Sequence, residues 1–168
     1  MSRRRDPQIA LRLDAGYPDP AESWHDGATI DYLGSKLRLV LGTEHGEAAR
    51  SGDTLSLPLP PQATPRQIQD RAEAWLREEA TRLLEQIIEQ EFTERSGNKP
   101  GSRAPRLTLS FAAGGHWVEA REPNTLRCNW RLIQQPRPAI KQAIARGIAA
   151  LPAEQAGLDL FGMPTAAG

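Results

Sequence analysis

The residue types that most often do chemistry in proteins are few in this chain and lie far apart. The three histidines are His25, His45 and His116, and no two of them lie within four residues of each other. Two metal ligands on one helix need a spacing of about four residues, because only then do both side chains point the same way. The histidines therefore predict no helical metal site, and each is most simply a solvated loop side chain.

The other nucleophiles and motifs point to no active site either. Cys128 is the only cysteine, which excludes an internal disulfide and any site built from several cysteines. It lies in the apolar stretch 126–130, where a buried small residue is a simpler interpretation than a reactive thiol. No Gly-x-Ser-x-Gly elbow and no glycine-rich phosphate loop with lysine occurs. The glutamates between residues 73 and 91 are typical of a solvated helix face.

Length and composition predict one domain of ordinary size. The chain has 168 residues, of which 39% are hydrophobic, and its 21 Lys and Arg balance 21 Asp and Glu. This bulk charge does not indicate nucleic-acid binding. The longest apolar runs are far shorter than the roughly 20 residues that span a bilayer. The basic start 1–6 precedes no apolar segment of the kind found in secretory signals. We therefore expect a cytoplasmic protein without a membrane partner.

The first half of the chain predicts a small sheet followed by a long helix. Residues 1–26 have no period and predict a flexible arm. Alternating residues in 28–33 and 36–41, separated by Gly34, predict a hairpin; 42–52 reads as a loop and 54–59 as a third strand that ends in proline. The stretch 64–92 predicts an amphipathic helix, with Thr64 and Gln67 as a capping box.

The second half predicts further short strands and one core helix. Strands are expected over 106–111, 116–120 and 125–130. A helix after Pro136 should bury one apolar stripe and end before Pro152. The stripe comprises Ile140, Ala143, Ile144, Ile148 and Leu151. Taken together, the pattern predicts an α+β fold with small antiparallel sheet regions, a domain over 27–152 and a flexible tail over 153–168.

One stretch carries a resemblance to a known family. Trp117, then Asn129-Trp130-Arg131-Leu132-Ile133, then a proline turn and an apolar helix resemble the YgjP-like metallopeptidases, which are kin to the SprT and WLM zincins. The resemblance covers roughly residues 26–151. It implies a zincin-like core helix that carries zinc ligands, and a structural role for Trp117, Asn129, Trp130 and Arg131.

The chain departs from the family pattern where the family's chemistry would lie. The resemblance places Arg146 and Ala150 at the two zinc-binding histidines and Gly147 at the general-base glutamate, and no histidine follows His116. A catalytic zinc needs three protein ligands, a bound water and a carboxylate to take its proton. The resemblance therefore implies an inactive protein without metal or cofactor, retained to bind or regulate a protein partner. A residual metal-dependent hydrolase is an alternative that no group of residues supports.

The tail carries a second resemblance. Gly157-Leu158-Asp159-Leu160-Phe161 resembles the peptide with which bacterial proteins bind the DNA sliding clamp, except that glycine replaces the usual glutamine. Such peptides dock apolar anchors from a disordered segment. An accessory protein tethered to the clamp is therefore an alternative function. The simpler interpretation is that Leu160 and Phe161 fold back onto the protein's own core.

Overall fold

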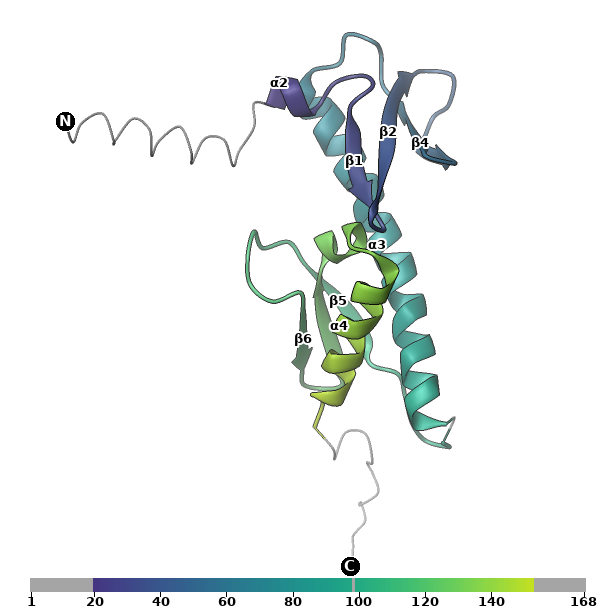
Figure 1. Ribbon diagram of the computed structural model, residues 1–168, viewed down its shortest axis with the longest axis vertical. Coiled ribbons are helices and arrows are strands. Elements are labelled where there is room, and N and C mark those ends of the chain that lie inside the picture. The colour runs from purple at the N-terminus through teal and green to yellow at the C-terminus, as the bar shows by residue number, and fades with distance from the viewer. Residues whose placement is uncertain (1–19, 98, 153–168) are drawn as a thin grey trace, which may run out of the picture. The chain divides into compact units, whose positions relative to one another are not determined.

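The computed structural model describes residues 20–97 and 99–152 (Figure 1). The predicted tail and most of the predicted N-terminal arm lie outside the described residues. The last part of that arm includes a short helix, α2 (Pro20–Ser23), which the sequence pattern did not predict. No helix in the described ranges is both long and apolar enough to cross a membrane.

The chain divides into two compact units. Of the described residues, the first unit comprises 20–30 and 36–73, and the second comprises 31–35, 74–97 and 99–152. The long helix α3 (Pro65–Ser96) contributes its first turns to one unit and the remainder to the other. Each unit is described by itself below.

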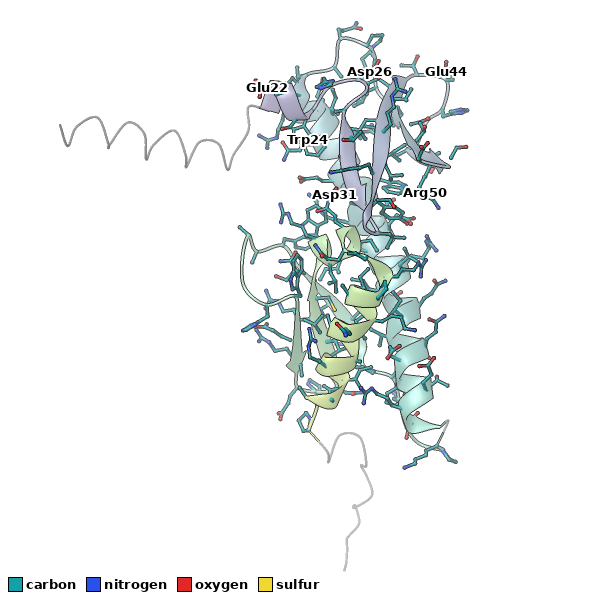
Figure 2. The ribbon with its side chains drawn as sticks, viewed as in Figure 1. Glu22, Trp24, Asp26, Asp31, Glu44 and Arg50 are labelled. Atoms are coloured by element: carbon teal, nitrogen blue, oxygen red, sulfur yellow. The ribbon has the colours of Figure 1, made fainter. Side chains whose placement is uncertain are left out.

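The first unit contains a four-stranded sheet with the order β1-β2-β4-β3. Its strands are β1 (Thr29–Tyr32), β2 (Ser35–Gly42), β3 (Ala49–Ser51) and β4 (Thr54–Pro58). Leu39 and Leu55 are fully buried, as the alternation predicts. The Asp26 carboxylate accepts a hydrogen bond from the Leu41 N–H at 3.1 Å and so ties the segment before β1 to β2 (Figure 2).

Two expectations about this sheet were wrong. The stretch 42–52 is not all loop, because β3 lies within it; all three of its residues are exposed, so it has no alternation to detect. The sheet is also mixed rather than antiparallel, since β2 and β4 run parallel, with Leu39 opposite Leu55. Alternation assigns residues to faces but carries no information on strand direction.

The long helix begins as its capping residues predict. The Gln67 N–H donates to the Thr64 hydroxyl at 3.1 Å, and the Gln67 side chain accepts from the Thr64 N–H at 2.9 Å. The helix continues past the predicted end at residue 92 to Ser96. Gly97 then adopts a φ of +62° and donates its N–H to the Thr93 carbonyl, which is a glycine stop.

The second unit contains a three-stranded sheet with the order β5-β7-β6. Its strands are β5 (Arg106–Ser110), β6 (Val118–Arg121) and β7 (Thr125–Asn129), each close to a predicted range. This sheet is mixed too, because β5 and β7 run parallel. After β7 come the 3₁₀ helix η1 (Trp130–Gln134) and the predicted core helix α4 (Arg137–Ala149), so Trp130 opens a helical turn rather than closing a strand.

The turn of the first hairpin belongs to the second unit. The Leu33 and Gly34 N–H groups donate to the carbonyls of Ile133 and Gln134 at 2.9 and 3.0 Å. Gly34 has a φ of +80°, and a Cβ atom there would lie 2.9 Å from the Pro136 ring. Only glycine satisfies both the backbone conformation and this close approach. With helices and small sheets in both units, the predicted α+β class is confirmed.

Candidate functional site

The helix α4 approaches β6 closely at one glycine. A Cβ atom on Gly147 would lie 2.6 Å from Val118 Cγ1 and 3.2 Å from Leu126 Cδ2. Ile140 and Ile144, on the same helix, are fully buried, whereas Ile148 and Leu151 are only half-buried and so extend the predicted stripe less than expected. The contact at Gly147 fixes how near the helix lies to the sheet.

A cavity of about 260 Å³ opens beside this contact. It brings together residues of α4 and residues around the start of β6. Its walls are His116, Trp117, Val118, Ala120, Ala143, Arg146, Gly147 and Ala150. All three positions that the family resemblance assigns to zinc chemistry, Arg146, Gly147 and Ala150, therefore line one cavity with His116 and the exposed ring of Trp117.

The residues around this cavity do not fit the zinc that the resemblance implies. His116 is the only cavity residue with a side chain that commonly binds zinc, and a catalytic site needs three. Arg146 adds a permanent positive charge, which opposes a cation. Within the described residues, no group of three His, Cys, Asp or Glu side chains could hold a metal ion anywhere. Arg146 gives the cavity a positive charge, and apolar residues, among them the large Trp117, form most of its other walls.

The Asn-Trp-Arg stretch forms the junction between β7 and η1. The Asn129 side chain accepts from the Arg131 N–H at 3.0 Å, which caps η1, and donates to the Ala112 carbonyl at 3.0 Å, which holds the loop that follows β5. Two guanidinium groups lie over the buried Trp130 ring, that of Arg131 at 4.6 Å and that of Arg77 at 5.4 Å from the ring centroid. These contacts support a structural role for the stretch.

Cys128 is fully buried on β7, the central strand of the three-stranded sheet. Burial raises the pKa of the Cys128 thiol to about 12, because a thiolate would lose its hydration there. The thiol is therefore protonated at neutral pH, which is the opposite of what a nucleophile needs.

A polar cluster in the second unit joins Tyr32 to the long helix. The Tyr32 hydroxyl and the Arg82 guanidinium both donate to Glu79 Oε1 at 2.7 Å, and the Tyr32 and Trp75 rings lie 5.2 Å apart. The hydrogen bond to Glu79 raises the pKa of Arg82. No spacing in the sequence reveals this cluster, since Tyr32 and Glu79 lie 47 residues apart. Both groups at the carboxylate are donors, which is the arrangement of a structural tie.

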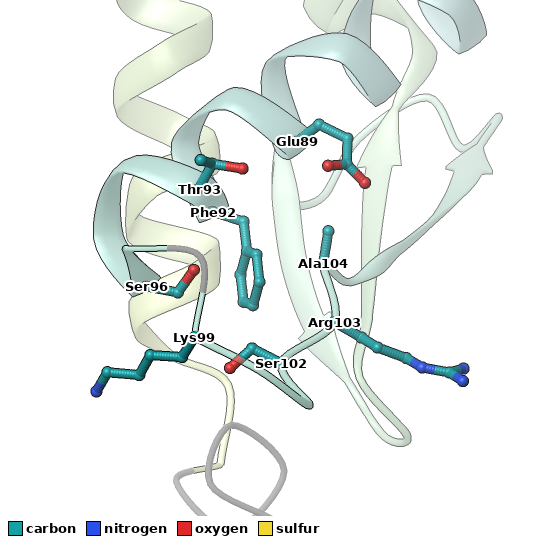
Figure 3. A pocket seen from close by; sticks show the side chains of 8 residues that line it. All are labelled: Glu89, Phe92, Thr93, Ser96, Lys99, Ser102, Arg103 and Ala104. Atoms are coloured by element: carbon teal, nitrogen blue, oxygen red, sulfur yellow. The ribbon is translucent and has the colours of Figure 1, made fainter.

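A larger cavity of about 470 Å³ lies at the end of α3 (Figure 3). Phe92 points into it, near Ser102 and Ala104, while the charged ends of Lys99 and Arg103 point outward in opposite directions. The polar groups therefore do not converge on one point, as a ligand site requires. The sequence did not predict this cavity, and its shape supports no chemistry.

The structure brings some of the predicted site residues together, while others lie outside the described residues. It brings Trp117 together with Arg146, Gly147 and Ala150, and it places Asn129, Trp130 and Arg131 at a structural junction. The clamp-like residues Leu158, Asp159, Leu160 and Phe161 lie outside the described residues. Sequence reasoning treated His116 as a solvated loop residue and missed that it lines the cavity; its position next to Trp117 was the available signal.

Comparison with known proteins gives one match. A family model described as "YgjP-like, metallopeptidase domain" matches residues 8–145. The matched segment ends one residue before Arg146. Searches of curated proteins and of solved structures return no significant match.

Proposed function

The chain belongs to the YgjP-like metallopeptidase domain family, and from this membership we propose that it is a catalytically inactive member retained as a binding or regulatory module. The proposal concerns the cavity between α4 and β6. It assigns that cavity to ligand binding, without zinc and without hydrolysis.

The close contact of Gly147 with Val118 is the observation that carries the proposal. The resemblance assigns the general-base glutamate to position 147, but a Cβ atom there already comes within 2.6 Å of Val118. A glutamate therefore has no room unless β6 or α4 moves. Position 147 therefore lacks the carboxylate, and Val118 also occupies the space that a glutamate side chain would need.

The composition of the cavity wall supports a binding role. Arg146 is exposed and its charge is permanent, His116 offers a ring nitrogen for hydrogen bonding, and Trp117 offers an aromatic ring that is 46% exposed. No acidic side chain lines the cavity. These groups favour a ligand that presents a carboxylate or another anion next to an apolar surface, such as an acidic segment of a partner protein.

Elemental analysis and an activity assay test the proposal together. The protein purified without added metal should contain far less than one zinc per chain, and it should not cleave an unfolded protein substrate with or without added zinc. About one zinc per chain together with proteolysis that a chelator abolishes would overturn it.

A second candidate function rests on the tail sequence. Leu158, Asp159, Leu160 and Phe161 match four of the five positions of the clamp-binding peptide. We propose that this segment, if it is not packed on its own domain, tethers the protein to the bacterial sliding clamp. Binding at the tail leaves the cavity free, so both functions could reside in one chain.

A further inference from the structure

The sheet β5-β7-β6 has one apolar face and one polar face. Strand pairing places Leu107, Leu126 and Ala120 in one row and Leu109, Cys128 and Val118 in another. These rows face α4, since Gly147 lies against Val118 and Leu126. The alternating rows face the other way, because successive side chains of a strand point to opposite faces.

The polar face carries three arginines. Arg106 of β5 and Arg121 of β6 lie opposite Thr125 of β7, one on each side. Arg127 lies in the next row on this face, between Thr108 and Glu119. All three arginines are exposed. Of these three arginines, Arg121 forms a salt bridge with Glu119 at 3.1 Å. The hydrogen bond from Arg121 lowers the pKa of Glu119, and the nearby charge of Arg127 lowers it further, so on this face three arginines stand against one carboxylate.

The neutral net charge of the chain conceals a strong segregation of charge. Residues 99–149 contain nine Lys and Arg but only two Glu, a net charge of +7. The helix α3 contains eight Asp and Glu against five Arg, a net charge of −3. The balanced bulk charge therefore hides a basic segment, which includes the whole of this sheet. An uneven charge of this size is typical of proteins that bind polyanions.

Exposed aromatic rings lie at one end of the same sheet. Phe111 follows β5 directly and is 60% exposed, and Trp117 precedes β6 and is 46% exposed. β5 runs parallel to β7 and β6 runs antiparallel to it, so the last residue of β5 and the first residue of β6 both lie beside the C-terminal end of β7. The loop 112–116 between the two aromatic residues covers a cavity of about 210 Å³. Arg121, Arg127 and Glu119 line this cavity together with the backbone of Gly114 and Gly115.

We propose that the polar face of this sheet binds single-stranded nucleic acid. Arg106, Arg121 and Arg127 contact consecutive phosphates, and unpaired bases stack on Phe111 and Trp117 at the end of the sheet. Proteins that bind single strands combine a basic track with aromatic platforms in this way. A duplex would leave the aromatic rings unused, because its bases are already stacked. This function goes beyond the binding module proposed above: its arginines lie on the opposite face of the sheet, and Trp117, at the end of the sheet, also lines the cavity beside α4.

Titration of a labelled oligonucleotide tests the proposal. The full chain should bind an oligothymidylate of about 12 nucleotides in fluorescence anisotropy with a Kd of about 1–10 µM at roughly 50 mM salt. The logarithm of the association constant should fall with the logarithm of salt concentration with a slope of about −2, for three phosphates contacted by a single strand. Phe111→Ala should weaken this binding about fivefold and leave duplex binding within about twofold.

A matched pair of triple variants separates the face from bulk charge. Arg106→Gln with Arg121→Gln and Arg127→Gln should weaken binding at least about tenfold and remove most of the salt dependence. Arg66→Gln with Arg71→Gln and Arg95→Gln removes the same charge from exposed positions of α3 and should leave binding within about twofold. Should the first variant melt early, Thr108→Glu on the same face must weaken binding instead. Equal loss in both triple variants, no binding at about 100 µM, or equal affinity for an oligoglutamate would overturn the proposal.

Discussion

Gly147 of α4 and Val118 of β6 lie so close that a Cβ atom on the glycine would come within 2.6 Å of the valine Cγ1. In an ordinary helix, replacing glycine with alanine stabilises by about 1 kcal/mol. Here the added methyl overpacks a stiff, β-branched neighbour, which typically costs about 1–3 kcal/mol. We expect Gly147→Ala to lower the free energy of unfolding by about 1–2 kcal/mol in urea denaturation.

The control for this substitution removes the valine methyls. In a Val118→Ala background, Gly147→Ala should be neutral or stabilising by up to about 1 kcal/mol, because helix propensity is then opposed only by the looser approach to Leu126 at 3.2 Å. The same loss in both backgrounds would show that the contact with Val118 does not set the approach of helix and sheet.

Two histidine substitutions in the cavity beside Gly147 should create a zinc site. Arg146 and Ala150 are one helical turn apart and line the same cavity as His116. Arg146→His with Ala150→His removes the opposing charge and supplies two nitrogen ligands in addition to His116. We expect this variant to bind about one zinc per chain in a dialysis measurement, and the wild-type protein to bind none.

His116→Ala in the same variant is the matched control for that gain. It removes the third nitrogen ligand and should weaken zinc binding at least about tenfold. Unchanged zinc affinity would mean that His116 lies outside the engineered site, and no binding by the double variant would separate this cavity from the family's metal position.

The packing of α4 gives a third prediction. Ile144 is fully buried, so Ile144→Ala should cost about 2–5 kcal/mol through lost burial and the cavity left behind. We expect the buried Trp130, on the chain segment that leads into this helix, to pack with Ile144. Ile148→Ala on the same helix, at a half-buried position, should cost clearly less, and near-equal losses of under about 0.5 kcal/mol would contradict the placement of the helix.

Much of this fold could be predicted because its signals are local. The capping box at Thr64 and Gln67, the glycine at the first hairpin turn and the alternation in β5 act within a few residues, and the structure contains all of them. Strand direction, by contrast, depends on connections that a single strand does not contain. The sequence pattern therefore predicted antiparallel sheets where β2–β4 and β5–β7 pair in parallel.

The site shows the same division. Sequence reasoning could identify Arg146, Gly147 and Ala150 as departures from a family pattern, but it could not show that Val118 fills the space at Gly147, because β6 and α4 are separate in the chain. The sequence pattern did not predict the basic face of the sheet, for a similar reason. Summing all charges cancels the acidic helix against the basic sheet, and only the strand register places three arginines on one face.

Burial of Cys128 predicts slow thiol chemistry. With its pKa raised to about 12 and the side chain enclosed, the thiol should react with an aromatic disulfide reagent at pH 8 orders of magnitude more slowly than in urea-unfolded protein. Below the unfolded pKa, near 9.0, the thiol is protonated in both states; as pH rises from there towards 12, only the unfolded state ionises and stability falls. The stability advantage of wild type over Cys128→Ala should therefore shrink across that range, and rapid labelling of the folded protein would contradict the burial.

The tail supplies the last prediction. If residues 153–168 tether the protein to the sliding clamp, a synthetic peptide of this segment should bind the clamp with a Kd near 1 µM, about −8 kcal/mol, because ordering a short peptide offsets part of the contact energy. Leu160 and Phe161 should provide most of the affinity and Leu158 less. The peptide with Leu160→Ala and Phe161→Ala should then fail to bind in the same calorimetric titration. No binding by the parent peptide at about 100 µM removes the clamp hypothesis. The apolar pair must then be covered by the protein itself, and the same double substitution in the full chain should lower its melting temperature.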